Sequence, residues 1–392
     1  MQWSSTVPDP AGMPSPDRSL RVALVGPGFP PQLGGIETHL AKLADGLAAS
    51  GCEVDVLVQQ GHQDALVPPV EHLRSGVTVR RFRSRTHSRR FPVAPSLIPF
   101  LLSNSSRYDV VHGHSFHAVP ASLAAFLTKG PFVFTPHYHG GGHTQAARVL
   151  HQFYRPVGAG TFRRAQVFIA NSRHEAALLT ADFPLIEPNL HVVYPGVDVD
   201  EILAAKPYPT DRRVILTGGR LEEYKQVDIA LRALPLLPKE VHLVILGEGP
   251  ALPRLRELTV ELSAESQVTF LGRIDTPSVR RWQRTAAVGL SLSRHEAFGL
   301  TLLEGLVGGA QVVATDIPAS REVASILPRG TLFVPVTPSP DEVAAAIRQQ
   351  LDATPAGSGL DAVPTWPNLT LACLDLYVEA MRAHDRRGVV LR

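Results

Sequence analysis

The stretch VILTGGRLEEYKQVD, residues 214–228, contains the structural unit from which the fold can be inferred. Its first three residues are apolar and two of them are β-branched, which is typical of a buried strand. Gly218 and Gly219 then permit a tight turn, and apolar residues at helical spacing follow over about residues 227–236. A strand, a glycine turn and a helix in this order predict an α/β protein with a mostly parallel sheet.

The same unit recurs along the chain, with helical patterns between most of the strands. In the C-terminal half, strands are expected in HLVILGEG (242–249), VTFLG (268–272), VGLSLS (288–293), VVATD (312–316) and TLFVP (331–335). In the N-terminal half, they are expected in RVALVGPGF (21–29), EVDVLVQ (53–59), VTVRRF (77–82), DVVHGHS (109–115), FVFTPH (132–137), QVFIANS (166–172) and HVVYPG (191–196). The sequence therefore predicts two doubly wound, Rossmann-like α/β domains facing a cleft, with ligands beyond the carboxyl ends of the strands.

The length of 392 residues also favours two domains, because a single core rarely grows that large. A polar stretch with Pro207 and Pro209 indicates a linker. The expected division is a flexible N-terminus at 1–19, an N-terminal domain at 20–198, a linker at 199–212, a C-terminal domain at 213–365 and a C-terminal helix at 366–392.

The C-terminal helix is expected to be amphipathic and to pack back toward the N-terminal domain. The apolar residues expected to dock it are Leu371, Leu374, Leu376, Tyr377 and Met381.

Composition and charge exclude several classes of protein. The formal net charge is +2, from 38 basic and 36 acidic residues, whereas a nucleic-acid-binding protein usually has a larger and clustered positive excess. Only Cys52 and Cys373 are present, which excludes a disulfide framework or a cysteine zinc site. No apolar run approaches the length of about 18 residues that a membrane span needs, and the N-terminus has no apolar signal core. We therefore expect a cytoplasmic protein.

Two cations follow the glycine turn, where Arg220 and Lys225 stand five residues apart. A planar guanidinium and a compact ammonium near strand ends suit the two phosphates of a diphosphate. Two solvated charges on a loop would explain them as well. Lys225 is one of only five lysines in the chain, which weakly favours the diphosphate.

A second motif, HEAFGLTLLEGL at residues 295–306, places two glutamates around a helix start. Gly299 allows a ligand to approach the backbone, and the amides of Phe298, Gly299 and Leu300 open a helix N-terminus, which attracts anions. Carboxylates beside that site would accept hydrogen bonds from hydroxyls. Alternatively, Glu304 completes a capping box that begins at residue 301, and Glu296 is an exposed loop carboxylate.

Together, GRLEEYK (219–225) and SLSRHEAFGLTLLEGL (291–306) resemble the donor-binding half of the retaining glycosyltransferases of the GT-B fold, family 4. The likeness extends from Arg21 to the final helix. It implies that Glu296 contacts hydroxyls of the donor hexose and that Glu304 contacts the nucleotide ribose. It further implies that Arg220 and Lys225 hold the diphosphate.

The resemblance also implies backbone positions next to the nucleotide. LGEGP (246–250) resembles the second glycine loop of the family, and FLGRI (270–274) resembles the segment whose backbone meets the base. The further donor-binding positions implied in this half are Gly219, Gly247, Gly249, Arg273, Ile274, Phe298, Gly299 and Leu300.

In the N-terminal half, GFPPQLGGIETHL (28–40) resembles the first loop of the family, in which Gly34 and Gly35 open a helix beside the donor phosphates. A plain Rossmann-type turn would need glycines too. The spacing is not the GxGxxG of dinucleotide-binding proteins, so we exclude a hydride-transfer enzyme.

Histidines follow two of the expected strands. In FTPHYHGGGHT (134–144), the resemblance implies that His137 faces the donor sugar, although His139 is an alternative in that register. His139, His143 and, from HGHSFH (112–117), His114 are expected on the acceptor side; packed or solvated histidines would explain the same pattern. A metal site is disfavoured, because no carboxylate or cysteine completes one within the run.

RRFRSRTHSRR, residues 80–90, contains six arginines. A solvated basic loop is the favoured interpretation, and a patch for an anionic acceptor or a membrane surface is the alternative.

The expected function is transfer of a hexose or amino-hexose, with retention, from a nucleoside diphosphate sugar to a hydroxyl. The donor is expected to be UDP-linked, with GDP-mannose next, and catalysis to depend on His137, Arg220, Lys225 and Glu296 without a metal or other cofactor. Richness in Arg, Ala and Pro is typical of GC-rich actinomycete genomes, which favours a small acceptor such as an aminocyclitol of an aminoglycoside antibiotic. The alternatives are a lipid or cell-envelope acceptor, an inactive nucleotide-sugar-binding protein, and an epimerase or hydrolase.

Overall fold

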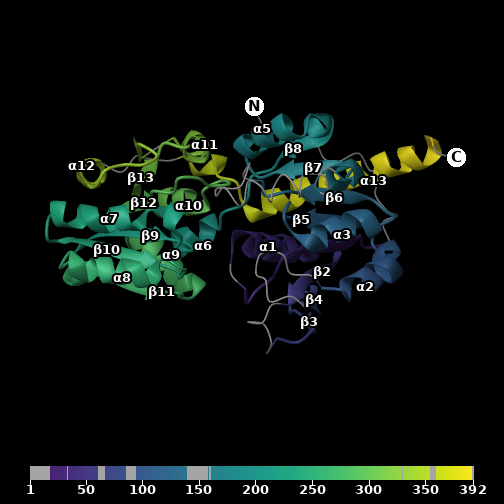
Figure 1. The fold of residues 1–392 in the computed structure, drawn as a ribbon, viewed down its shortest axis with the longest axis horizontal. Coiled ribbons are helices and arrows are strands. Elements are labelled where there is room, and N and C mark those ends of the chain that lie inside the picture. The colour runs from purple at the N-terminus through teal and green to yellow at the C-terminus, as the bar shows by residue number, and fades with distance from the viewer. Residues whose placement is uncertain are drawn as a thin grey trace. The chain divides into compact units, whose positions relative to one another are not determined.

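The computed structural model describes residues 18–32, 34–60, 67–84, 94–138, 158, 160–328, 330–353 and 359–390. They form two compact units (Figure 1). Unit 1 comprises the described residues up to Tyr194 and from Trp366 onward, and unit 2 comprises Pro195–Thr365. Each unit contains a largely or wholly parallel sheet with helices on both faces, so the predicted fold class of two Rossmann-like α/β domains is confirmed.

Unit 1 is built on an eight-stranded sheet with the order β3-β4-β2-β1-β5-β6-β7-β8. Only β3 runs antiparallel to its neighbour, β4. It was not predicted, because its three residues contain a single apolar side chain. The strands are β1 (Arg21–Gly26), β2 (Glu53–Gln60), β3 (Val70–His72), β4 (Thr78–Arg83), β5 (Val110–His114), β6 (Phe132–Thr135), β7 (Val167–Ala170) and β8 (Leu190–Val192).

Alternate residues of the strands in unit 1 pack into two cores, one on each face of the sheet. Val22 and Leu24 of β1 belong to one core, and Ala23 and Val25 belong to the other. The first core is covered by α1 (Gly35–Ala49) and α13 (Trp366–Val390), and the second by α2 (Leu97–Asn104), α3 (Val119–Leu127) and α5 (Arg173–Asp182).

Helix α13, drawn in yellow in Figure 1, packs against α1 and so belongs to unit 1. Its buried face differs from the prediction in one residue, since Leu371 is 59% exposed. The residues that dock the helix are Trp366, Leu369, Cys373, Leu376, Tyr377 and Ala380, with Leu374 and Met381 packed at the edge.

Unit 2 is built on a six-stranded parallel sheet with the order β11-β10-β9-β12-β13-β14. The chain builds outward in one direction from β9 and then in the other from β12, so the strand order reverses between these two strands. In open α/β sheets, ligands bind at the carboxyl ends of the strands where the order reverses. The strands are β9 (Arg213–Gly218), β10 (Val241–Leu246), β11 (Val268–Gly272), β12 (Val288–Ser291), β13 (Gln311–Thr315) and β14 (Thr331–Val334).

The helices of unit 2 cover both faces of this sheet. They are α6 (Val199–Ala204), α7 (Val227–Ala233), α8 (Leu252–Glu261), α9 (Thr276–Thr285), α10 (Leu300–Gly308), α11 (Pro318–Ile326) and α12 (Pro340–Asp352). Helix α6 occupies part of the expected linker at 199–212, but it packs against α9 and α10. The linker prediction was therefore wrong at its N-terminal end.

The basic run at 80–90 begins inside the sheet. Arg81 is 5% exposed and donates to Glu71 at 2.7 Å, and Arg80 pairs with Asp55 at 3.2 Å. A wholly solvated loop is therefore the wrong description for its first residues, while residues 85–90 lie outside the described part of the chain. None of the described helices has both the length and the apolar character needed to cross a bilayer.

Candidate active site

The loops after β9, β10 and β11 are held together by backbone contacts. The Gly219 amide donates to the carbonyl of Leu246 at 3.2 Å, and the Gly247 amide donates to the carbonyl of Gly272 at 2.7 Å. Gly247 has φ +98°, and a Cβ atom there would overlap the Gly219 carbonyl. Both the backbone conformation and the close approach therefore require glycine at 247.

Gly249 has a similar reason to be glycine. A Cβ atom at this position would overlap the backbone of Leu221, whose amide donates to Glu248 O at 2.9 Å. The close backbone approach thus explains Gly247 and Gly249 without a ligand. Their predicted place beside a nucleotide stays a prediction.

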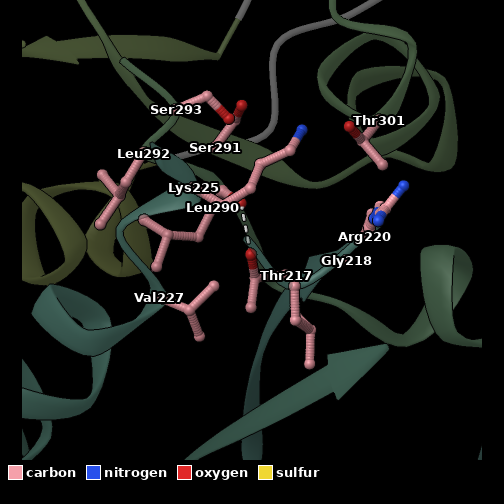
Figure 2. A pocket seen from close by; sticks show the side chains of 11 residues that line it. Thr217, Gly218, Arg220, Lys225, Val227, Leu290, Ser291, Leu292, Ser293 and Thr301 are labelled. Carbon is pink, nitrogen blue, oxygen red and sulfur yellow. Dashed lines mark hydrogen bonds between the residues drawn. The ribbon is translucent and has the colours of Figure 1, made fainter. Parts of the chain in front are cut away.

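A pocket lies at the carboxyl ends of β9 and β12, where the strand order reverses. Figure 2 shows the polar ends of Arg220, Lys225 and Thr301 on the same side of it. The hydroxyl of Thr217 is turned to the Leu290 carbonyl at 3.0 Å. The pocket therefore presents two cations beside hydroxyl groups.

Lys225 forms an ion pair with Glu296, and the Ser293 hydroxyl donates to the same Glu296 Oε1 at 2.7 Å. The two charged side chains are only 16% and 17% exposed. The alternative that Glu296 is an exposed loop carboxylate is therefore wrong. The carboxylate is fixed beside a cation at the edge of the pocket.

The Lys225–Glu296 pair is positioned by the residues on either side of Lys225. Tyr224 stacks on His295 with ring centroids 4.2 Å apart, and its carbonyl accepts the Arg294 amide at 2.9 Å. Gln226 is buried with φ +52°, and its side-chain amide donates to the Leu292 carbonyl at 2.6 Å. These contacts hold the turn η4 (Glu223–Lys225) against the loop that carries Glu296.

Arg220 differs from Lys225 in its freedom to move. Its side chain is 64% exposed, and its Nε lies 2.8 Å from a carboxylate oxygen of Glu222. A pair this exposed contributes little stability, so an anion in the pocket can compete for the guanidinium.

Helix α10 begins at the pocket. Gly299 is its N-cap with φ +99°, and no side chain of the described residues caps the helix. The predicted capping box from Thr301 to Glu304 is therefore not formed, and Thr301 lines the pocket instead. The first-turn amides of Leu300 and Thr301 have no partner within the helix, which makes this end attractive to an anion. Phe298, just before the cap, is 3% exposed.

Two side chains of α9 bind the carboxylate of Glu304. Arg280 donates to Oε1 at 2.7 Å and Gln283 donates to Oε2 at 3.0 Å. Arg280 also pairs with Asp198 at 2.7 Å, so it joins the segment before α6 to α9 and α10. Each Glu304 oxygen retains a further lone pair, so a ribose contact stays a prediction.

The remaining donor-binding predictions are less constrained. Arg273 is exposed, and Ile274 packs at the edge of the cluster that contains Leu216 and Leu246. In unit 1, Gly34 is the extended N-cap of α1, a conformation open to any residue, and a Cβ atom at Gly35 would meet no described atom within 4 Å. Backbone constraints in the described part of the chain therefore do not explain Gly35.

Histidines of unit 1 form a buried cluster at the ends of β5 and β6. His112 is held by the hydroxyls of Tyr377 and Thr135, each at 2.8 Å. The ring of His39 from α1 lies with its centroid 5.2 Å from that of His137 and 5.6 Å from that of His114. Within the described ranges, no group of three His, Cys, Asp or Glu side chains is arranged to hold a metal ion.

His114 was expected on the acceptor side, but it is fully buried. Its Nδ1 lies 3.4 Å from His137 Nε2. His114 therefore contacts other histidines and offers no open face, because β5 ends inside the core. His139 and His143 lie outside the described residues.

Two family models match consecutive parts of the chain. The model of Glycosyltransferase Family 4 matches residues 33–201, and the model of Glycosyl transferases group 1 matches residues 198–356. The chain belongs to the family 4 glycosyltransferases. The two matches meet close to the boundary between unit 1 and unit 2 at Tyr194.

This glycosyltransferase is similar to curated relatives from actinobacteria. It is 26% identical over 399 residues to the D-inositol 3-phosphate glycosyltransferase of Xylanimonas cellulosilytica, covering 90% of this chain and 94% of the relative. It is 29% identical over 348 residues to the phosphatidyl-myo-inositol mannosyltransferase of Mycobacterium tuberculosis, covering 85% and 87%.

Among solved structures, the glycosyltransferase is similar to HepE (Alr3699) of Anabaena in complex with UDP and glucose. The TM-score is 0.68 at 18% identity, over 95% of this chain and 99% of HepE. At this identity the likeness shows the shared GT-B fold.

Sequence reasoning missed the residues that support the site of this glycosyltransferase. Arg280 and Gln283 stand three apart on α9, a spacing that places both on one helix face and could have been noticed. Glu175 ends a Ser-x-x-Glu capping signature that begins at Ser172, and Asn171 directly precedes this signature. The signals were local, but the groups that these residues hold lie on other segments of the chain.

Proposed function

We propose that this glycosyltransferase transfers a hexose or amino-hexose from a UDP-linked donor to a hydroxyl of a cyclitol, with retention and without a metal ion. An aminocyclitol of the aminoglycoside type is the first acceptor class, and an inositol phosphate is the second. Both are polyhydroxylated six-membered carbocycles. The inositol substrates in the names of two relatives support this acceptor class, and the UDP in HepE supports the donor.

One observation carries the proposal: the Lys225–Glu296 pair stands next to Arg220 at the start of α10. A nucleoside diphosphate sugar places phosphates next to sugar hydroxyls. Lys225, Arg220 and the first amides of α10 suit the phosphates, and the Glu296 carboxylate suits a hydroxyl. The arrangement thus matches the two neighbouring parts of such a donor.

In the proposed reaction, an acceptor oxygen forms a bond to the anomeric carbon while the bond from that carbon to the diphosphate oxygen breaks. The acceptor proton passes to the departing diphosphate oxygen on the same face, which retains the configuration. The two cations and the helix amides stabilise the negative charge that develops on the leaving group.

The cations are tested by Arg220→Ala, Lys225→Ala and the double variant. We expect each single change to lower kcat/KM about 100-fold, as for the loss of one donor to developing charge. Arg254→Ala with Lys239→Ala is the matched control, because both of these side chains are exposed in the same unit. Unimpaired transfer by the Arg220, Lys225 double variant would refute the proposed diphosphate site.

The substrates are tested with UDP- and GDP-linked hexoses against an aminocyclitol and an inositol phosphate. NMR of the product gives its anomeric configuration, which we expect to match that of the donor. Activity that EDTA abolishes and Mg²⁺ restores would contradict metal independence. Donor hydrolysis at equal rates with and without acceptor would show that the protein is a hydrolase and not a transferase.

A second candidate acceptor is a lipid-linked cyclitol. Helix α2 exposes Leu102 at 60% and Ile98 at 37%, and it follows the basic run at 80–90 in the sequence. An apolar helix face after a basic segment suits the surface of an anionic membrane. Sedimentation with phosphatidylinositol vesicles, followed by transfer to that lipid, would favour this acceptor over a free cyclitol.

A further inference from the structure

Glu175 is a buried carboxylate at the start of α5 that the proposed reaction does not use. It is 1% exposed, and three N–H groups point at it. The Tyr138 amide donates to Oε1 at 2.5 Å, and the Asn171 amide donates to Oε2 at 2.7 Å. The side-chain nitrogen of Asn171 donates to Oε2 at 3.1 Å.

These bonds determine which way the Asn171 side chain faces. An ionised carboxylate only accepts hydrogen bonds, so the NH₂ group of Asn171 has to face Glu175. The same nitrogen lies 3.1 Å from His137 Nδ1, so it donates its second proton to that ring atom. In neutral His137 the ring proton is therefore on Nε2.

Glu175 also fixes the backbone around His137. His137 has φ +49°, an uncommon conformation for a residue with a side chain. The bond from the next amide, Tyr138 N, to Glu175 ties this turn to the end of β7, where Asn171 lies. One buried carboxylate thus fixes both the turn and the tautomer of the histidine.

The Nε2–H of His137 is directed at His114 Nδ1, at the long distance of 3.4 Å. A hydrogen bond of this length is weak. His114 is fully buried, and its other ring nitrogen has no hydrogen-bond partner among the described residues.

We propose that Glu175 and Asn171 are positioning residues that keep the His137 ring in its Nε2–H tautomer, and that transfer depends on this tautomer. The carboxylate of Glu175 orients the Asn171 amide, and that amide orients the imidazole. The dependence of transfer on the tautomer rests on the proposed function. The tautomer itself does not.

The substitution Glu175→Gln tests the direction of this chain with little change in volume. The NH₂ group that this substitution introduces faces either the Tyr138 amide or Asn171, because a backbone N–H group points at each carboxylate oxygen. Where it faces Asn171, the Asn171 side-chain amide turns so that an oxygen faces His137 Nδ1, and the proton of His137 moves from Nε2 to Nδ1. A merely structural Glu175 predicts no change of tautomer.

The first readout is ¹⁵N NMR of the histidine-labelled full chain at about pH 8.5, above the pKa of Glu175 of about 7. The His137 signals are those missing from His137→Asn. We expect the Nε2–H tautomer in the wild type and a mixture of the two tautomers in Glu175→Gln. An Nδ1–H tautomer in the wild type, or no change in the variant, overturns the proposal.

The second readout separates transfer from nucleotide binding. We expect Glu175→Gln to lower kcat at least twofold with the Kd for UDP within twofold of the wild type, whereas Glu187→Gln, an exposed glutamate of unit 1, keeps both. An unchanged kcat despite the changed tautomer overturns the role in transfer. If Glu175→Gln fails to fold, Asn171→Ala replaces it, with a mixture of tautomers and the same loss of kcat expected.

A wild type that neither binds UDP nor transfers sugar would refute the proposed function. The NMR result would still decide the tautomer, so the two failures are distinguishable.

Discussion

Arg280 holds residues of the candidate site, although it lies far from them in the sequence. Its guanidinium is 9% exposed and binds Asp198 and Glu304 on two other segments. The two glutamates of the motif at 295–306 could be predicted from sequence. Their partners could not, because Arg280 and Gln283 precede Glu304 by more than twenty residues and belong to another helix.

We expect Arg280→Met to lower the free energy of unfolding by about 3 kcal/mol, because it leaves two largely buried carboxylates without their cation. Chemical denaturation of the full chain measures this. Arg254→Met is the control, since Arg254 is 59% exposed and ion pairs on the surface contribute little to stability. Equal effects of the two changes would contradict the structural role of Arg280.

The histidine cluster predicts a loss of stability in acid. Burial lowers the pKa of His39 from 6.5 to about 4, and burial lowers the pKa values of His112 and His114 well below 6.5. A depressed histidine pKa gives stability that is complete above pH 6.5 and lost as the pH falls toward 4. For His39 alone the loss is at most about 3 kcal/mol.

The contribution of Glu175 to stability changes with pH in the opposite direction. Burial raises its pKa from 4.5 to about 7, although the three N–H groups oppose this shift. Its protonated form is thus favoured in the folded state, which gives stability that is complete below pH 4.5 and lost as the pH rises through 7. Denaturation from pH 4 to 8 should therefore give shallower acid loss for His39→Asn and smaller loss at high pH for Glu175→Gln. Parallel curves for the wild type and a variant would contradict the shift assigned to that residue.

At the scale of elements, the local sequence pattern predicted the strands that are apolar and end in glycine. It failed where the pattern was polar or short. β3 has one apolar residue, and α6 lies in a stretch that was assigned to a linker. In both, packing against neighbouring elements decides the structure, and a single stretch of sequence does not contain that information.

Two glycines, one just after β10 and one at the start of α1, should respond in opposite ways to alanine. Gly247→Ala meets both a positive φ and the Gly219 carbonyl, so we expect a loss of more than about 2 kcal/mol. Gly35→Ala has open space in the first turn of α1 and should raise stability by about 0.5 kcal/mol. Thermal unfolding measures both. If Gly35→Ala also lowers transfer at undiminished stability, Gly35 lies beside the donor as predicted.

At the scale of the whole molecule, the two-domain organisation could be predicted because each half repeats the same strand-to-helix unit. The surroundings of His137 could not, since Asn171 and Glu175 follow it by more than thirty residues. Binding at the pocket of unit 2 can be tested by itself.

UDP at a concentration of 100 times its Kd should raise the free energy of unfolding by about 2.7 kcal/mol if it binds only the folded chain. Differential scanning calorimetry of the full chain measures the shift. We expect the Arg220, Lys225 double alanine variant to lose most of it and the Arg254, Lys239 control to retain it. A shift that survives in the double variant would place the nucleotide elsewhere.

The position of α13 in unit 1 also has a consequence for synthesis on the ribosome. Tyr377 and Cys373 fill the core beneath α1, and the Tyr377 hydroxyl meets His112 of β5, yet all of unit 2 is translated before them. The first unit to leave the exit tunnel is therefore completed last. A nascent chain that stalls before Trp366 would present an unsealed apolar groove to chaperones, while unit 2 could already be folded.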